Sequence, residues 1–436
     1  MFKNINIISD NYLCSNCGAC YSICPKDAVE FKMTNIGRIY ATTNDKCIGC
    51  GLCVKVCPSF NINPEPTLDD VLGCASELYT GISLNHQLYT NGQSGGLCAT
   101  IIKYLFETNR IDAAIVCKST YGFPQPKVES IVIEDACELM AVQKSCYTPI
   151  PLLKSLKHTS KYNRIALVGL PCHIQGAKLL SKTSSKFHNI KYYIGLICDR
   201  TLTNALFDII HSKIKSKVPY NVNWRHKGFT KDGDFHQYND SPLVVTDECG
   251  NEHTFPKSYR ISLKEYLTPP RCRVCCDKIN TEADIVLGDP WRLESTDTKH
   301  GESLILTRTK LGSELIEKMI EEDVVQLKKR RTEDIITSQQ LNKRQKESSL
   351  FLKALLNLRK SNGLNYLFSV KKSQHEGNRH IKEYEKKIEN FTKTECLSNE
   401  LIIQKGLEII RKYKKREKIQ NCLLFRLVNK IKNLVQ

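Results

Sequence analysis

A doubled cysteine run near the N-terminus constrains this 436-residue chain more than any other feature. Residues 14–25 and 47–58 each read Cys, two residues, Cys, two residues, Cys, three residues, Cys, Pro. Zinc sites are mostly built from paired Cys-x-x-Cys motifs. A disulfide framework needs a secreted chain, whereas residues 1–4 open no signal-peptide pattern. The doubled run with its trailing proline is instead typical of proteins that bind 4Fe–4S clusters.

In that arrangement three thiolates of one run hold a cluster, and the fourth reaches the cluster of the other run. We therefore expect two 4Fe–4S clusters, one held by Cys14, Cys17, Cys20 and Cys57 and the other by Cys47, Cys50, Cys53 and Cys24. Residues 29–32 and 38–40 read as a hairpin between the cysteine loops. The sequence thus predicts an α+β ferredoxin-like domain of the two-cluster type over residues 1–66.

Composition indicates the redox environment of the protein and the location of its charge. The 21 cysteines, without a secretory signal, predict a reducing, cytoplasmic environment and metal ligation. No apolar run reaches the roughly 18 residues of a transmembrane segment. The formal net charge is +18, and most of the surplus lies in a predicted, mainly helical C-terminal extension over residues 319–436.

Two explanations of this basic extension remain open. A solvated helical face is favoured, and binding to nucleic acid or to an anionic membrane is the alternative. Residues 422–428 fit an amphipathic helix that packs on the protein body or on a partner. The other interpretation of this helix is peripheral contact with a membrane surface.

The segment between these regions, residues 67–318, is expected to form a mixed α/β domain. Its predicted buried strands cover residues 111–117, 164–168, 191–198 and 283–287. A glycine-rich turn made of Gln93, Ser94, Gly95 and Gly96 precedes a predicted helix over residues 97–106. Free N–H groups at such a helix start favour a phosphate or the edge of an isoalloxazine ring.

Four further cysteines of this domain follow predicted strands or lie in loops: Cys172, Cys198, Cys272 and Cys275. We interpret them as ligands of a third 4Fe–4S cluster, because ligand sites of open α/β sheets lie at the strand ends. Alternatively, Cys172 is a lone reactive thiol at a helix N-terminus, and the later pair binds zinc or no metal. Spacing does not decide between Cys275 and its neighbour Cys276.

Polar residues beside these cysteines are candidates for the substrate side of the site. His173, Asp199 and Arg200 are the candidate catalytic residues, and Asp289 and Trp291 lie in a later loop. The alternative for each of them is structural, with the aspartates as loop caps and the tryptophan as a core anchor.

The order of these motifs resembles the coenzyme F-420 hydrogenase/dehydrogenase beta-subunit family over about residues 10–310. The resemblance implies a FAD flavoprotein with an iron–sulfur cluster in the same domain. It places the family's cluster ligands on Cys172, Cys198, Cys272 and Cys275, and its flavin-contacting turn on Gln93, Ser94, Gly95 and Gly96. The family's Lys-Tyr segment falls on Cys146 and Tyr147, so its basic residue is replaced and Lys144 is the candidate substitute. Lys144 and Tyr147 are therefore further candidate cofactor-binding residues. This departure bears on the identity of the hydride donor.

The resemblance implies an oxidoreductase that couples hydride chemistry at FAD to one-electron transfer through three 4Fe–4S clusters. A reduced deazaflavin, a ferredoxin or another redox protein is the expected partner. The alternatives are an electron-transfer subunit without its own substrate site and a ferredoxin-dependent reductase of polysaccharide biosynthesis. A cluster protein that binds nucleic acid is the least favoured function.

Overall fold

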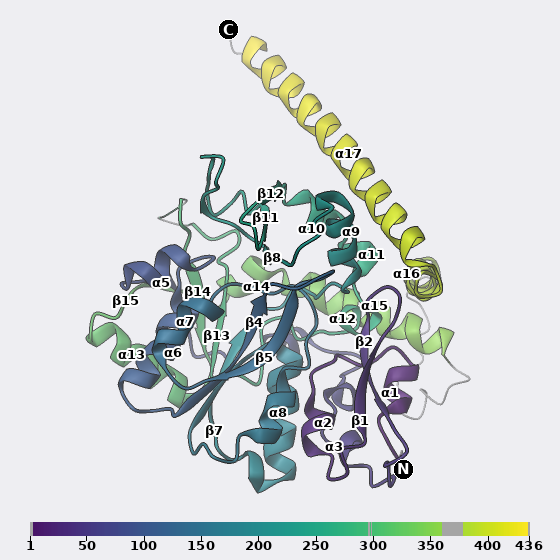
Figure 1. The fold of residues 1–436 in the computed structure, drawn as a ribbon. Helices are drawn as coiled ribbons and strands as arrows, with labels where there is room; N and C mark the ends of the chain where they lie inside the picture. The colour runs from purple at the N-terminus through teal and green to yellow at the C-terminus, as the bar shows by residue number, and fades with distance from the viewer. Residues whose placement is uncertain (1–2, 295–296, 298, 360–377, 435–436) are drawn as a thin grey trace.

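A mixed eight-stranded sheet forms the centre of the computed structural model, which describes residues 3–294, 297, 299–359 and 378–434 (Figure 1). The strand order is β15-β3-β14-β13-β7-β6-β4-β5. The neighbours from β13 to β4 run parallel, and the remaining pairs are antiparallel. The strands are β3 (Glu77–Ser83), β4 (Ala113–Thr120), β5 (Lys127–Ile133), β6 (Ile165–Gly169), β7 (Ile190–Leu196), β13 (Ile285–Gly288), β14 (Ser303–Thr307) and β15 (Val325–Arg330).

Helices cover both faces of this sheet because successive side chains of a strand point to opposite faces. In β6, Ala166 belongs to the buried cluster under α6 and α13, whereas Leu167 belongs to the cluster under α8. Predicted strands 111–117, 164–168, 191–198 and 283–287 are thereby confirmed with boundary shifts of a few residues. The helices of this part are α4 (Leu68–Leu72), α5 (His86–Asn91), α6 (Leu97–Glu107), α7 (Leu139–Val142), α8 (Pro171–Thr183) and α13 (Lys310–Glu321).

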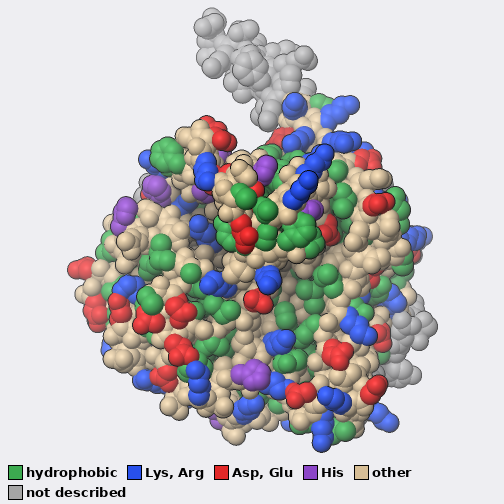
Figure 2. Space-filling model, in the orientation of Figure 1, with side chains coloured by type: hydrophobic (Ala, Val, Ile, Leu, Met, Phe, Trp, Pro, Cys, Tyr) green, Lys and Arg blue, Asp and Glu red, His purple; other side chains and the backbone are tan. Residues whose placement is uncertain are grey.

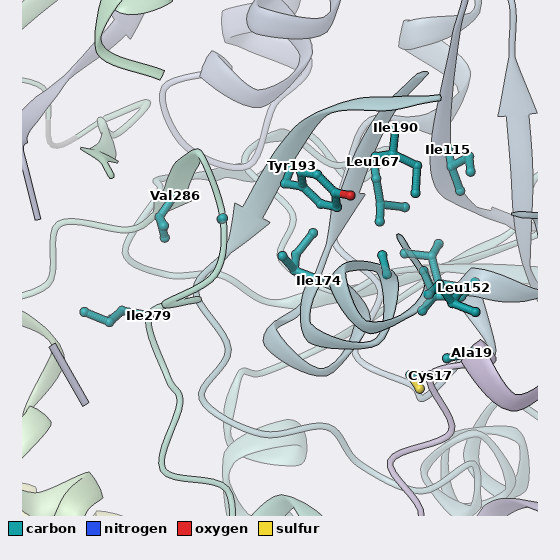
Figure 3. Packing of buried hydrophobic residues seen from close by; sticks show 14 of the residues in the cluster. Cys17, Ala19, Ile115, Leu152, Leu167, Ile174, Ile190, Tyr193, Ile279 and Val286 are labelled. Carbon is teal, nitrogen blue, oxygen red and sulfur yellow. The ribbon is translucent and has the colours of Figure 1, made fainter. Parts of the chain in front are cut away.

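The N-terminal region contains the predicted hairpin, since β1 pairs antiparallel with β2. Its elements are α1 (Asn6–Asp10), α2 (Ala19–Ile23), β1 (Val29–Met33), β2 (Ile39–Thr43) and α3 (Leu52–Lys55). This region is not a separate unit joined only by a linker. It packs on the face of the sheet that α8 covers. Cys17 and Ala19 lie in the same buried cluster as Leu152 and Ile174 (Figure 3).

A smaller layer follows β7 and covers one end of the sheet. It contains the three-stranded sheet β12-β11-β8 and the two-stranded ribbon β10-β9. Trp224 and Phe207 are buried at its centre. The elements are α9 (Ala205–Ile214), β8 (Tyr220–Asn223), β9 (Gly228–Phe229), β10 (Phe235–His236), β11 (Leu243–Asp247), β12 (Glu252–Phe255), α10 (Ser258–Ser262), α11 (Lys264–Leu267) and α12 (Pro270–Arg273).

The C-terminal segment is mostly helical, as predicted, but it also completes the main sheet. Strand β15 pairs with β3 along the sheet edge, and the predicted boundary at residue 318 falls inside α13. The lysines that made this stretch read as helical are common on edge strands, where they discourage further pairing. The helices are α14 (Asp334–Gln339), α15 (Leu341–Leu358), α16 (Asn378–Glu395) and α17 (Asn399–Leu434).

Basic side chains do not form one separate patch on the face shown in Figure 2. Figure 2 shows Lys and Arg side chains mixed with Asp and Glu across the visible face. Figure 1 shows α17 reaching away from the body, and the side chains of residues 422–428 lie outside the described part of the chain. None of the helices in the described residues is long and apolar enough to cross a membrane.

Candidate iron–sulfur and flavin sites

The eight N-terminal cysteines lie on two loops that each lead into a short helix through a left-handed glycine. Gly18 has φ 95° and Gly51 has φ 76°. A Cβ atom on Gly18 would lie 2.8 Å from the backbone nitrogen of Lys154, so this loop needs glycine to approach the segment around Lys154. The backbone N–H groups of Asn16 and Ala41 donate to Cys14 Sγ, both at 3.4 Å.

The structure brings the fourth cysteine of each run to the three cysteines of the other run. One cavity is lined by Cys24, Cys47, Cys50 and Cys53. Cys57 faces Cys14 and Cys17 instead, and burial raises the pKa of its thiol, with the nearby thiols adding to the effect. Burial also raises the pKa of Cys53 to about 11. Such thiols lose their protons when metal binds, and the crossed arrangement fits two clusters.

Four further thiols line a second cavity: Cys172, Cys198, Cys272 and Cys275. Cys172 is the second residue of α8, Cys198 follows β7, and the other two lie in and after α12. Cys276 does not line this cavity, and its side chain packs against the hydrophobic core under the sheet. The structure thus separates Cys275 from Cys276, which spacing alone does not.

Two buried arginines border the same cavity and suit an anionic group. Arg271 is 3% exposed and its Nε donates to Ser59 Oγ at 2.8 Å. Arg344 is 6% exposed, and its Nη2 donates to the backbone oxygen of Cys198 at 3.0 Å. Burial raises the pKa of the Cys172 thiol, and neighbouring thiols raise it further, while Arg271 opposes them. A bound 4Fe–4S cluster with a net charge of about −2 would give the two buried arginines a negative charge to pair with.

Among the described residues, no three His, Cys, Asp or Glu side chains converge closely enough to hold one mononuclear ion. A 4Fe–4S cluster is larger than a single ion, and its thiolates stand around a cube rather than around one atom. The cavities with four thiols each have the ligand number and chemistry that such a cluster needs.

The predicted catalytic residues line the second thiol cavity and are held by local partners. His173 Nδ1 accepts a hydrogen bond from the backbone N–H of Leu170 at 3.2 Å, and burial lowers its pKa to about 4. Asp199 forms an ion pair with Lys264 at 2.5 Å. Arg200 forms an ion pair with Glu347 at 3.0 Å. Their contacts favour a positioning role around the thiols.

The glycine-rich turn of residues 93–96 is clamped between β3 and β14. The backbone N–H of Gly95 donates to Ser303 Oγ at 2.9 Å. A Cβ atom on Gly95 would lie 2.3 Å from the backbone oxygen of Gly81, so no side chain fits. Gly96, at φ 76°, is the N-cap of α6.

Lys227 holds this turn in place through hydrogen bonds. No sequence motif indicated a role for this lysine. Its Nζ donates to the backbone oxygens of Ser94, Tyr89 and His300 at 2.8, 2.9 and 2.8 Å. Burial lowers the pKa of Lys227 to about 8. The lysine therefore joins three separate segments of chain at the turn.

Buried polar atoms without partners lie next to the turn. Gln93 Nε2 donates to Asn223 Oδ1 at 3.3 Å, while Gln93 Oε1 has no hydrogen-bond partner among the described residues. Arg225 forms a buried ion pair with Asp289 at 2.6 Å, and within the described chain its Nη2 is also without a partner. Trp291 lies 5.7 Å from the Arg225 guanidinium. Buried polar atoms normally find partners, so these atoms fit a bound polar ligand.

Residues 144–147, the segment that the sequence analysis compared with the family's Lys-Tyr pair, lie near the glycine-rich turn of residues 93–96. Lys144 is close enough to His226 to lower its pKa, although burial has the larger effect. Tyr147 packs edge-on against Trp224 with ring centroids 6.0 Å apart. Cys146 is hydrogen-bonded to Cys117 of β4. The structure thus brings Lys144 into the neighbourhood of the turn, as a substitute for the replaced basic residue would require.

Sequence reasoning missed Lys227, Arg225 and Ser303, which hold the turn or border it. Two of them belong to the run Trp224-Arg225-His226-Lys227, whose density of basic and aromatic side chains was the one available signal. No sequence signal indicated Ser303, because serine is common at the start of a strand.

Comparisons with known proteins agree with the fold. The models for the N-terminal and C-terminal parts of the coenzyme F420 hydrogenase/dehydrogenase beta subunit match residues 78–157 and 162–333. A 4Fe–4S dicluster model matches residues 13–61. The similar solved structures include a chain of the F420-reducing [NiFe] hydrogenase complex from Methanosarcina barkeri, with a TM-score of 0.51 at 21% identity, covering 68% of this chain and 96% of that chain.

Two curated relatives share the same region. An F(420)H(2) dehydrogenase subunit of Methanosarcina mazei is 28% identical over 335 residues, covering 71% of this chain and 88% of the relative. An uncharacterized protein of Methanocaldococcus jannaschii is 28% identical over 250 residues, covering 57% of this chain and 85% of the relative. With its 4Fe–4S dicluster region, the chain is an iron–sulfur member of the coenzyme F420 hydrogenase/dehydrogenase beta-subunit family of oxidoreductase subunits.

Proposed function

We propose that this chain is an iron–sulfur flavoprotein that couples two-electron hydride chemistry at FAD to one-electron transfer through three 4Fe–4S clusters. The observation that carries the proposal is the cavity lined by Cys172, Cys198, Cys272 and Cys275, beside the N-terminal thiols. The name of the F(420)H(2) dehydrogenase relative favours a reduced deazaflavin as the hydride donor. The likeness to a chain of a hydrogenase complex favours a redox protein as the partner.

Continuity between the thiol sets supports electron transfer within the chain. Ser15 of the first cysteine loop lines the same cavity as Cys172. A Cβ atom on Gly176 of α8 would lie 3.4 Å from Cys17 Sγ, so this helix packs directly on the first loop. Cys17 is also among the nearby thiols that raise the pKa of Cys172. The N-terminal thiols and the third set therefore meet across one shared wall.

The chain's own residues would bind and orient the flavin at the turn of residues 93–96. The N–H groups at the start of α6 would favour an anionic or electron-rich group of the flavin, and Lys227 holds the turn in shape. Arg225 Nη2 and Gln93 Oε1 have no hydrogen-bond partner within the described chain, and these two atoms would position the ligand. Bound FAD would supply the exchange between a hydride's two electrons and the single electrons that clusters carry.

Removing the Lys227 ammonium is expected to weaken flavin retention. In Lys227→Met the backbone oxygens of Ser94, Tyr89 and His300 lose their shared donor. A hydrogen bond from a charged group contributes about 1.5–3 kcal/mol, so the Kd for FAD should rise about tenfold or more. Fluorescence titration of the apoprotein with FAD measures this. The Lys299→Met variant, at an exposed lysine next to His300, is the control and should bind FAD like the wild type.

An anaerobic preparation tests the function as a whole. We expect about twelve iron atoms and one FAD per chain, and bleaching of the flavin absorbance by a hydride donor. Difference spectra against reduced deazaflavin, nicotinamide and ferredoxin identify the donor. A preparation with full iron content but no extractable flavin would contradict the proposal.

A second candidate function is an electron-transfer subunit that has no substrate site of its own. It is favoured by Cys146, which stands where the family has a basic residue and is turned to a hydrogen bond with Cys117. This candidate predicts that bound flavin is reduced only through a partner protein and never by a small hydride donor.

A further inference from the structure

The cavity of the second N-terminal cysteine set opens at the protein surface. Cys50 is exposed, whereas Cys17, Cys20 and Cys57 of the other set are buried at 7–8% exposure. Ile48, between two of the cysteines, is 63% exposed. This thiol set is therefore the one that a second protein can approach closely, and it presents an apolar side chain at its mouth.

Four lysines lie in or next to the segments that line this opening. Lys3 and Lys26 line the cavity itself, Lys46 precedes Cys47, and Lys55 ends α3. All four lysines are exposed, and none forms an ion pair with another described residue.

The acidic residues of the same surface do not neutralise the four lysines. Asp27 forms an ion pair with Lys157 of the second domain. Glu30 accepts a hydrogen bond from the neutral Asn44 Nδ2 at 2.6 Å, so it keeps its charge and offsets one lysine. Asp45 is exposed next to Lys46 and offsets one charge. The opening therefore keeps a positive excess from lysines that have no ion-pair partner within the described chain.

We propose that this lysine-rimmed opening, defined by Lys3, Lys26, Lys46, Lys55 and the central Ile48, is the docking surface for a small acidic one-electron carrier protein of the ferredoxin type. Complementary charge steers such a partner and fixes its orientation. The rim also offsets the charge of about −2 that a 4Fe–4S cluster would place beneath it, which would otherwise repel an acidic protein. The inference rests on the proposed function, because it names the partner of the same electron path.

The chemistry of the opening favours a protein over a polyanion. An exposed isoleucine at the centre with charges around it has the apolar core and polar rim of a protein interface. Nucleic-acid surfaces are recognised by phosphate contacts together with base stacking or groove insertion. No described aromatic side chain lines this cavity.

Direct binding measurements test the docking surface without relying on turnover. The Kd of the full-length holoprotein for a purified acidic two-cluster ferredoxin is measured by biolayer interferometry at low and at physiological salt. We expect Lys26→Glu combined with Lys46→Glu to weaken binding about tenfold or more and to flatten its salt dependence. Ile48→Asp should weaken binding without a comparable change in the salt dependence. The control combines Lys310→Glu with Lys318→Glu on α13, an exposed pair elsewhere on the molecule, and should bind like the wild type.

Several results would overturn the docking surface. They are wild-type affinity in the Lys26/Lys46 variant, equal weakening in the α13 control, or lysine-dependent binding of RNA or anionic vesicles without binding of ferredoxin. Iron content and visible absorption, measured on each variant, show that the clusters are retained. A chain that lacks flavin would overturn the proposed function while the ferredoxin titration still decides the docking surface. If the chain contains flavin but the lysine substitutions leave its Kd for ferredoxin unchanged, only the docking surface is overturned.

Discussion

Cys275→Ala is expected to remove one complete cluster, whereas Cys276→Ala is expected to leave all clusters in place. Iron per chain should fall from about twelve atoms to about eight in the first variant and stay at about twelve in the second. The reason is geometric, because Cys275 lines the cavity with the three partner thiols and Cys276 packs in the core. Iron and sulfide determination on anaerobically purified protein measures the difference.

The paired design controls for folding. The two cysteines are adjacent and of the same size, so a general loss of stability would affect both variants. Spectroscopy of the reduced protein should show the signals of the N-terminal clusters unchanged in Cys275→Ala, since their thiols belong to other loops. Equal iron loss in both variants, or loss in Cys276→Ala alone, would contradict the assignment of the cavity. Loss of four iron atoms in Cys172→Ala as well would extend it to the helix α8.

The parts of the fold predicted best from the sequence are those whose physics is local. The crossed cysteine sets follow from a spacing that only a few architectures use, and the hairpin β1–β2 follows from alternation around a turn. The strand–turn–helix around Cys172 follows from a buried run followed by proline. In each case the residues that decide the structure are neighbours in the chain.

The parts that the sequence did not reveal depend on contacts between distant segments. Lys227 holds the glycine-rich turn through the backbone oxygens of Tyr89, Ser94 and His300, which lie on two stretches of chain distant from residue 227, and no spacing rule connects them. The edge strand β15 carries lysines that resemble the helical tail around it. The choice between Cys275 and Cys276 depends on which thiol faces the cavity, a property of the folded loop.

The C-terminal helices illustrate the same limit, because their role depends on what they touch. The sequence indicated a basic extension without chemistry, whereas Phe351 and Leu355 of α15 lie in one buried cluster with Ile8 and Val29 of the N-terminal region. Gln345 Nε2 donates to the backbone oxygen of Pro66 at 2.8 Å. These helices therefore hold the N-terminal region against the rest of the chain.

A buried ion pair also joins the C-terminal helices to the N-terminal region. Arg38 Nε and Glu395 Oε1 lie 2.5 Å apart, with the side chains 8% and 9% exposed. Arg38 also stacks between the rings of Tyr12 and Tyr40, at 4.5 and 4.7 Å from their centroids. Glu395 ends α16, so the pair joins the last third of the chain to the β1–β2 hairpin.

Glu395→Ala should lower the free energy of unfolding by about 3–5 kcal/mol, because it leaves the Arg38 guanidinium buried without a counter-charge. Arg38→Met combined with Glu395→Leu should recover most of this loss, since removing both charges abolishes the desolvation cost. Urea unfolding followed by cluster absorbance measures the effect. The exposed pair Glu408–Lys412 on α17 is the control, and Glu408→Ala should leave the free energy of unfolding close to the wild-type value. If Glu395→Ala were no more damaging than that control, the C-terminal helices would not be held to the N-terminal region by this pair.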